Sequence, residues 1–195
     1  MQNEIPTLIV LLNGKRKSGK DFLAELLNKR LGADRSVIVR LSAPIKSRFA
    51  EEYQLDYNKL LSDSGYKETY RQEMIVWGER MRAVDNGYFC RLALEMAGAD
   101  RYPVWIVSDT RRRTDISWFR EKYGDRVKTI QVKANLTTRE LRGFVFTKGV
   151  DDAESECDLD GVTGWDLTVV NNGDPRPLDE AVDTVTAWCT PERSA

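Results

Sequence analysis

The chain has 195 residues, a formal net charge of −1 and no histidine, and this length suits one domain that buries a core without metals or disulfides. The near-zero charge excludes a global field that attracts nucleic acid or anionic membranes, and no apolar run is long enough to span a bilayer. The absence of histidine excludes serine–histidine and cysteine–histidine catalysis and histidine-ligated metals, so the chemistry must use Asp, Glu, Lys and Arg.

The three cysteines, Cys90, Cys157 and Cys189, are odd in number and far apart. We therefore expect free thiols in a reducing compartment rather than a disulfide framework or a zinc site. The first residues lack the features of a signal peptide, and the last residues differ from a peroxisomal Ser-Lys-Leu address. Both observations favour a cytosolic location.

The first predicted elements are a buried strand at 7–13, a glycine-rich loop at 14–21, and a helix that continues to residue 31. The loop reads Gly-Lys-Arg-Lys-Ser-Gly-Lys-Asp, which has the spacing of a P-loop. Its glycines let several backbone N–H groups point at one phosphate chain, the helix N-terminus adds partial positive charge, and Lys20 can reach the outer phosphates. The alternative, a turn that binds nothing, gives no reason for four crowded cations.

Asp21 departs from the P-loop pattern, because Ser or Thr usually offers a hydroxyl to Mg²⁺ at this position. A carboxylate also ligates Mg²⁺, directly or through water, and it suits the first turn of a helix. We therefore expect a variant phosphate loop with Asp21 at the metal.

Five predicted strands alternate with helices, which implies a parallel sheet covered by helices on both faces. Ser42 is the expected N-cap of the first helix after the second strand. The predicted strands are 7–13, 37–41, 104–108, 127–133 and 167–171, and the predicted helices between the second and third strands are 44–53, 56–61, 67–84 and 88–97.

These patterns predict one domain, 1–195, with two excursions that close on a site at the carboxyl edge of the sheet. The first is a helical substrate-binding region, 42–101. The second, 137–164, begins basic and becomes acidic, and we name it the predicted lid. The core consists of 1–41, 102–136 and 165–190.

Asp109 follows the third strand directly, where P-loop enzymes place a carboxylate for Mg²⁺. The alternative is that Asp109 caps the helix predicted near Asp115. Arg111 and Arg112 come next and suggest a clamp for an anionic acceptor, because arginine holds phosphate through paired hydrogen bonds. Arg113 fits a solvated basic turn better.

Further cations lie in the two excursions. Arg139 and Arg142, on one helical face of the predicted lid, can neutralise charge that develops during phosphoryl transfer. The acidic stretch 151–156 could bind metal, start a helix, or hold the lid arginines in an open state. In the helical region we expect most cations to form a solvated face; they are Lys46, Arg48, Lys67, Arg71, Arg80, Arg82 and Arg91.

Together these residues resemble the animal phosphomevalonate kinases over nearly the whole chain. The distinctive matches are the phosphate loop that ends in aspartate and the string Gly-Val-Asp-Asp-Ala-Glu-Ser-Glu-Cys at 149–157. Others are Arg-Leu-Gly-Ala at 30–33, Arg-Leu-Ser at 40–42, Tyr-Lys-Glu at 66–68, Trp-Gly-Glu at 77–79, Phe-Cys-Arg at 89–91, Val-Ser-Asp-Thr-Arg-Arg at 107–112, Trp-Phe-Arg-Glu at 118–121, Arg-Gly at 142–143 and Val-Phe-Thr at 145–147.

The resemblance implies an α/β P-loop fold of the nucleoside-monophosphate-kinase type, with sheet order 2-3-1-4-5. It implies that the γ-phosphoryl group of ATP passes to 5-phosphomevalonate with Mg²⁺, in the mevalonate route to isoprenoids and sterols. It also assigns residue roles. The residues expected to bind ATP are Gly14, Lys15, Arg16, Lys17, Ser18, Gly19, Lys20, Asp21, Arg142 and Asn171. The residues expected to bind the acceptor are Arg82, Arg91, Arg111, Arg112 and Asn171. The expected catalytic residues are Lys17, Lys20, Arg111, Arg112 and Arg142, and the expected metal ligands are Asp21 and Asp109.

One segment departs from the family. The chain has Asn171-Asn172-Gly173 after the last strand, where the family has Asn-His-Gly.

Two other functions remain open at this stage. A P-loop kinase of another phosphorylated acceptor, such as a nucleoside monophosphate, would share the same pattern. A GTP-dependent switch needs Asn-Lys-x-Asp, and the nearest string, at 147–151, has one residue too many. A nucleic-acid module is disfavoured by the net charge. The expected partners are therefore ATP and phosphomevalonate, without nucleic acid or membrane, and the expected state is a monomer.

Overall fold

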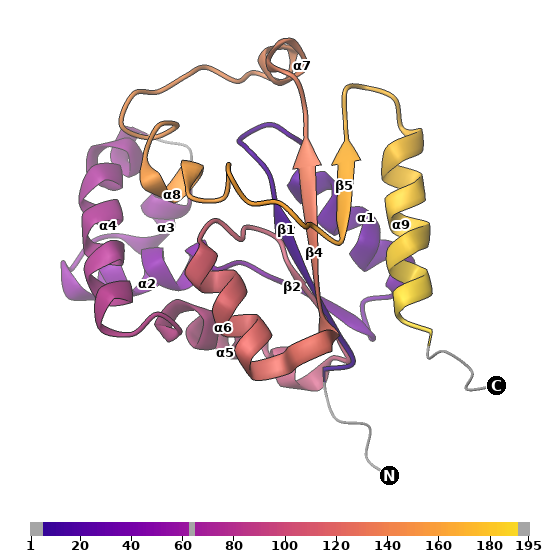
Figure 1. Ribbon diagram of the computed structural model, residues 1–195. Helices are drawn as coiled ribbons and strands as arrows, with labels where there is room; N and C mark the ends of the chain where they lie inside the picture. The colour runs from indigo at the N-terminus through magenta and orange to yellow at the C-terminus, as the bar shows by residue number, and fades with distance from the viewer. Residues whose placement is uncertain (1–5, 63–64, 191–195) are drawn as a thin grey trace.

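The computed structural model describes residues 6–62 and 65–190 and shows a parallel sheet between helices (Figure 1). The five strands lie in the order β2-β3-β1-β4-β5, which confirms the expected topology. Their bounds are β1 Leu8–Asn13, β2 Ser36–Val39, β3 Val104–Val107, β4 Val127–Lys133 and β5 Leu167–Val170. The residues that carry the expectations about targeting signals lie outside the described part of the chain.

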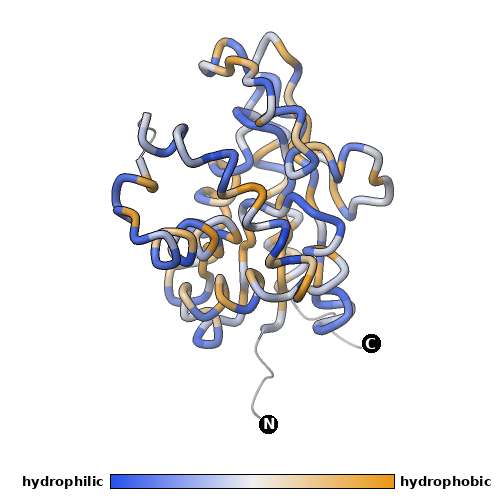
Figure 2. The backbone as a smooth tube through the Cα atoms, turned by 90° about the vertical axis from the view of Figure 1, so that its left-hand side faces the viewer, coloured by the Kyte–Doolittle hydropathy of each residue, from blue (hydrophilic) through white to orange (hydrophobic). Residues whose placement is uncertain are grey.

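The sheet separates two hydrophobic cores, because successive side chains of β1 point to opposite faces. Val10 and Leu12 pack with α1 Lys20–Leu31 and α9 Arg176–Trp188, whereas Ile9 and Leu11 pack with α5 Tyr88–Ala97 and α6 Arg113–Tyr123. Short 3₁₀ helices, η1 Ala99–Arg101 and η2 Gly124–Arg126, precede β3 and β4. Figure 2 shows the hydrophobic positions, in orange, running through the centre of the fold.

The region between β2 and β3 is helical, as predicted. It contains α2 Ser42–Glu52, α3 Tyr57–Leu61, α4 Gly65–Val84 and α5. The region has its own small core, in which Trp77 lies 5.8 Å from Phe49 and 5.7 Å from Phe89 between ring centroids.

The prediction that Ser42 is an N-cap is wrong, because α2 already begins at Ser42. The first N–H groups of the helix are satisfied by a side chain distant in the sequence. Leu41 and Ser42 donate to the two carboxylate oxygens of Asp109, at 2.6 and 3.0 Å. These contacts join residues that are 68 and 67 positions apart in the sequence. The sequence around Ser42 therefore contains no pattern that predicts them.

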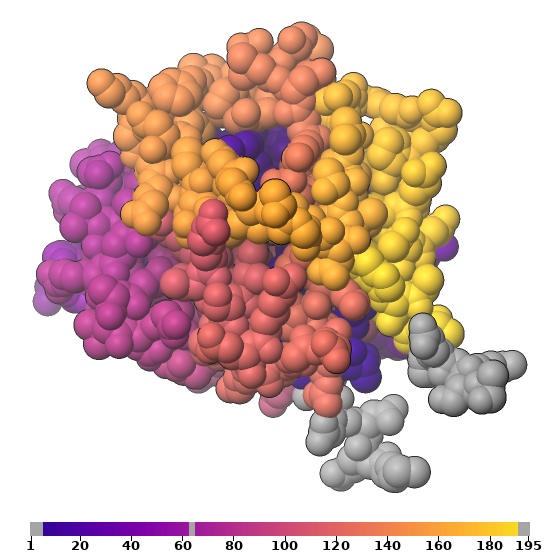
Figure 3. Space-filling model, viewed as in Figure 1, coloured from indigo at the N-terminus to yellow at the C-terminus, as the bar shows by residue number. Residues whose placement is uncertain are grey.

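The predicted lid connects β4 to β5 across the top of the sheet (Figure 1). It contains α7 Leu136–Leu141 and α8 Glu154–Cys157. In the space-filling view, indigo atoms from the start of the chain are visible at the bottom of an opening bordered by this segment (Figure 3). None of the described helices is both long and apolar enough to cross a membrane.

Candidate active site

The phosphate loop has a backbone that depends on its glycines. A Cβ at Gly14 would lie 2.5 Å from Ser18 Oγ, and one at Gly19 would lie 2.2 Å from Asn171 Nδ2. Gly19 also has a φ of 97°, and Lys17 adopts 64° although it is not glycine. The loop therefore holds a curled shape that positions its N–H groups for an anion.

The side chains of the loop also fit a bound triphosphate. Ser18 is buried, and its Oγ has no hydrogen-bond partner among the described residues. Lys20 is 9% exposed, with Nζ 3.0 Å from Asp21 Oδ1 at the start of α1. Lys20 could bind phosphate oxygens and the mostly exposed Asp21 carboxylate could bind Mg²⁺, which proteins often hold through a single carboxylate plus substrate phosphates.

Two acidic residues between the end of β3 and the first turn of α6, Asp109 and Asp115, have separate structural partners. Asp115, the third residue of α6, accepts the backbone N–H groups of Arg111 and Arg112 at 3.3 and 3.1 Å and so caps the start of its own helix. The expectation that Asp109 caps this helix is wrong, because Asp109 accepts from the start of α2 instead. Its expected role at the metal stays a prediction.

A cavity of about 200 Å³ lies between α2, α4 and the end of β3, and we name it the acceptor cavity. Apolar residues such as Ile45 and Met74 share its wall with polar ones. Its basic lining residues are Lys46, Lys67, Arg71, Arg82, Arg111 and Arg112.

The cations of this cavity are close enough to affect one another. Burial lowers the pKa of the Lys46 ammonium from its ordinary value, and the charges of Lys67, Arg111 and Arg71 lower it further, against the raising effect of Asp109. A group of like charges facing one cavity indicates an anion site.

The prediction that these cations form a solvated face is wrong for Lys46, Lys67 and Arg71. The sequence did contain a pattern that indicates this face. Residues 67, 71, 74, 75, 78 and 82 of α4 line the cavity and recur at helical spacing.

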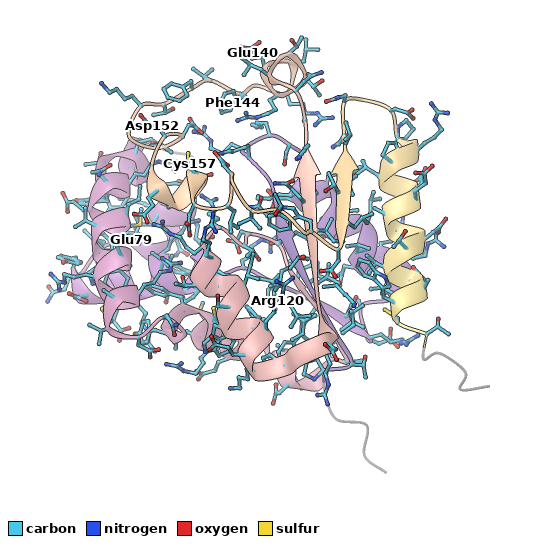
Figure 4. The ribbon with its side chains drawn as sticks, in the orientation of Figure 1. Glu79, Arg120, Glu140, Phe144, Asp152 and Cys157 are labelled. Atoms are coloured by element: carbon cyan, nitrogen blue, oxygen red, sulfur yellow. The ribbon has the colours of Figure 1, made fainter. Side chains whose placement is uncertain are left out.

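Carboxylates hold the arginines of the acceptor cavity in place. Arg112 is 4% exposed and pairs with Glu79, which belongs to α4 (Figure 4). Arg82 Nε lies 4.0 Å from Asp115, and its guanidinium lies 4.9 Å from the centre of the Phe89 ring. These contacts fix guanidinium groups that would otherwise repel each other.

Two of the predicted acceptor residues, Arg91 and Asn171, do not line the acceptor cavity in the described part of the chain, and Arg91 lies farther along the helical region. It pairs with Asp85, and in the described part of the chain it lines neither the acceptor cavity nor the cavity beside the phosphate loop. Its role stays a prediction.

A second cavity, of about 630 Å³, lies beside the phosphate loop and includes Gly14, Lys15 and Ser18 in its lining. Arg111 and Glu156 line both cavities. The two cavities therefore meet at this pair.

The acidic part of the predicted lid contacts cations of the core. Arg111 pairs with Glu156, Lys15 Nζ lies 2.7 Å from Asp160, and Arg16 NH1 lies 2.9 Å from Asp151. In the part of the chain that the structure describes, this stretch forms no ion pair with Arg139 or Arg142. The charge of Asp151 nevertheless opposes the lowering of the Arg139 pKa by burial, so the expectation that the stretch holds the lid arginines stays a prediction. In the described residues it also forms no cluster of acidic, cysteine and histidine side chains able to hold a metal.

The lid arginines contact the phosphate loop directly. Arg139 Nε donates to Arg16 O at 2.8 Å, and Arg142 donates to Ser18 O at 3.1 Å. Arg142 also donates to the side-chain oxygen of Asn171, at 3.0 Å, while Asn171 Nδ2 donates to Ser18 O at 2.9 Å. Arg142 and Asn171 thus meet at the phosphate loop, as the predicted ATP roles require.

The residues after Asn171 take structural partners. Asn172 accepts the N–H of Asn135 at 2.8 Å, and Arg176 pairs with Asp174 at 2.6 Å. The hydrogen bond between Asn135 and Asn172 joins the segment after β4 to the segment after β5.

A parallel sheet of this order, with a phosphate loop after β1 and cation-lined cavities at its carboxyl edge, is the arrangement of a P-loop kinase of small molecules. A solved structure, that of TT1252 from Thermus thermophilus, supports the fold; it has a TM-score of 0.54 at 18% identity and covers 95% of this chain and 99% of its own.

Sequence comparison identifies the family. The family profile described as "Phosphomevalonate kinase" matches residues 12–125. The phosphomevalonate kinase of Drosophila melanogaster is 51% identical over 179 residues, which are 90% of this chain and 93% of that protein. The chain belongs to the phosphomevalonate kinase family.

Proposed function

We propose that the protein transfers the γ-phosphoryl group of ATP to 5-phosphomevalonate and releases 5-diphosphomevalonate and ADP, as a step of isoprenoid and sterol synthesis. One observation carries the proposal: the cavity beside the phosphate loop and the cation-lined acceptor cavity meet at Arg111. A donor phosphate and an acceptor phosphate can approach each other only where their two sites join.

On the donor side, the phosphate loop binds the ATP phosphates through its N–H groups. Lys20 and Lys17 neutralise the outer phosphates, and Arg142 reaches the same loop from the predicted lid. These positioned charges act on the negative charge that spreads over the transferring group, which is how phosphoryl transfer is mainly accelerated.

On the acceptor side, Arg111 and Arg112 hold the phosphate, and Arg82 supports them within the same cavity. The acceptor phosphate is already an oxyanion near neutral pH, so no side chain is needed as a general base. This agrees with a chain that has no histidine.

The lining of the acceptor cavity favours an aliphatic acid over a nucleotide. Among the described residues that line it, none is aromatic, so no ring is present to stack on a base. Instead its lining combines several cations with the apolar side chains of Ile45, Met74 and Val150. Phosphomevalonate has an anionic group at each end and an aliphatic middle.

Mg²⁺ is part of the proposal, with Asp21 as its protein ligand, directly or through water. When bound, the ion would neutralise phosphate charge beside Lys20. The three free cysteines suit a reducing compartment such as the cytosol. We further propose a monomer that acts on small molecules.

A coupled assay of ADP release tests this function. With ATP and Mg²⁺, we expect rapid ADP release with 5-phosphomevalonate and only background release with AMP, CMP, GMP and UMP at equal concentration. Release with a nucleotide but not with phosphomevalonate would contradict the proposal.

A further inference from the structure

Asp109 is a buried carboxylate with two backbone partners. It is 7% exposed, and its two oxygens accept the N–H groups of Leu41 at 2.6 Å and Ser42 at 3.0 Å. These N–H groups stand at the start of α2, where an α-helix has no acceptors of its own. A carboxylate at this end also interacts favourably with the helix dipole, and bonds to a charged acceptor are strong.

The backbone on both sides of Asp109 is anchored to neighbouring strands. Ser108 N donates to Val39 O at 2.9 Å, which ties this point to β2. Thr110 N donates to Leu12 O at 3.1 Å, and Thr110 O accepts from the Asn13 side chain at 3.0 Å, which ties it to β1. The carboxylate therefore projects from a fixed part of the sheet edge.

The helix that Asp109 holds forms one wall of the acceptor cavity. Ser42, Ile45 and Lys46 of α2 line that cavity, and Arg111, two residues after Asp109, lines it from the sheet edge. We infer that Asp109 is a positioning residue that fixes the start of α2 against the end of β3 and so sets the spacing of Lys46 and Arg111 around the acceptor.

The charge of Asp109 serves the same arrangement. Burial and the neighbouring cations lower the pKa of Lys46, and the charge of Asp109 opposes this shift. Asp109 therefore supplies negative charge beside a cavity whose lining is crowded with cations. This role differs from the metal role that its place after β3 suggested, because it rests on the bonds that both oxygens accept from backbone N–H groups.

The variant Asp109→Asn tests the inference, since it keeps the volume and removes the charge and one acceptor. Without any ligand, amide hydrogens at 41–46 should exchange about tenfold faster, whereas those of β1 and β4 stay unchanged. This measurement needs no substrate, so it remains decisive even if the proposed function fails.

The kinetic part of the test rests on the proposed function. The KM for phosphomevalonate should rise about tenfold, while the Mg²⁺ concentration for half-maximal rate stays at the wild-type value. Asp100→Asn, at an exposed aspartate of η1, is the matched control and should change none of these quantities. Unchanged exchange at 41–46, or a raised Mg²⁺ requirement with an unchanged KM for phosphomevalonate, would overturn the inference.

If Asp109→Asn does not fold, Asp109→Glu replaces it. This variant keeps the charge and both acceptors on a side chain that is one carbon longer, so it would preserve a metal-ligating role but would move the start of α2. A raised KM for phosphomevalonate with an unchanged Mg²⁺ requirement supports the inference, and the reverse pattern contradicts it.

Discussion

At the residue scale, the chemistry of the site depends on single charges in fixed places. Lys20 is 9% exposed at the first position of α1, beside Asp21. Arg111 stands where the two cavities meet. Lys29 is an exposed lysine on the same helix as Lys20, and Arg113 is an exposed arginine close to Arg111. Substitutions at these two control positions can separate the effect of a charge in the site from effects on overall stability.

Lys20→Met should lower kcat about 10²–10³-fold, or about 3–4 kcal/mol, by analogy with the loss of one positioned donor in a closed site. The unfolding temperature should change little. Lys29→Met, at an exposed lysine on the same helix, serves as the control and should retain wild-type kcat. A Lys20→Met enzyme within about tenfold of wild type would remove the phosphate-loop assignment.

Arg111→Met should raise the KM for phosphomevalonate more than that for ATP, because the side chain reaches the acceptor cavity. Separate binding titrations with each ligand measure the difference. Arg113→Met is the neighbouring control, since the Arg113 side chain is 60% exposed and its ion pair among the described residues is with Asp158, at 3.4 Å. Loss of ATP affinity with unchanged acceptor affinity would refute the acceptor assignment.

At the element scale, local patterns predicted most of the fold. β4 has the predicted bounds, and the other strands end within two residues of prediction, because short apolar runs bounded by turns define them. The strand order came from the family resemblance, not from any local pattern. The phosphate loop could be found because its chemistry lies in eight consecutive residues.

The parts that could not be predicted depend on contacts between distant elements. The sequence spacing of Lys67 and Arg71 places both residues on one face of α4. Only the position of α4 in the fold shows that this face lines the acceptor cavity. The bond between Asp109 and Leu41 and the pair of Arg111 with Glu156 join separate elements, and no spacing within either segment signals them.

The acidic segment around α8 gives a prediction of its own. Glu156 neutralises Arg111 in the absence of ligand, so an acceptor phosphate must compete with it. Glu156→Gln should therefore strengthen binding of inorganic pyrophosphate and make it more dependent on salt, because a larger net positive charge then faces the anion. Glu140→Gln, at an exposed glutamate of α7, is the control. Weaker pyrophosphate binding by Glu156→Gln in calorimetric titration would show that Glu156 organises the site instead.

At the scale of the whole molecule, three parts converge on one edge of the sheet: the phosphate loop, the helical region 42–101 and the predicted lid (Figure 1). The predicted lid contacts the loop through Arg139 and Arg142 and contacts the core cations through its acidic residues. Anionic ligands would replace those acidic residues as counter-charges and draw the cations of all three parts together.

Closure of this kind should be visible in hydrogen exchange. Amides of 137–164 should exchange more slowly with both ligands than with either alone, and Arg142→Ala should weaken this effect and lower kcat/KM. Gly143, Gly149 and Gly164, all with positive φ, are the flexible positions on which we expect the segment to move. Equal exchange with and without ligands would exclude closure, although the kinase assignment would stand.

The central claim is that a phosphoryl group passes between two phosphates that meet at Arg111. Phosphorus NMR of a reaction with ATP, Mg²⁺ and 5-phosphomevalonate tests it most directly. We expect the phosphomonoester signal of the acceptor to be replaced by the two coupled signals of a diphosphate, in step with the appearance of ADP. Formation of ADP with inorganic phosphate, while the phosphomonoester signal persists, would contradict the account.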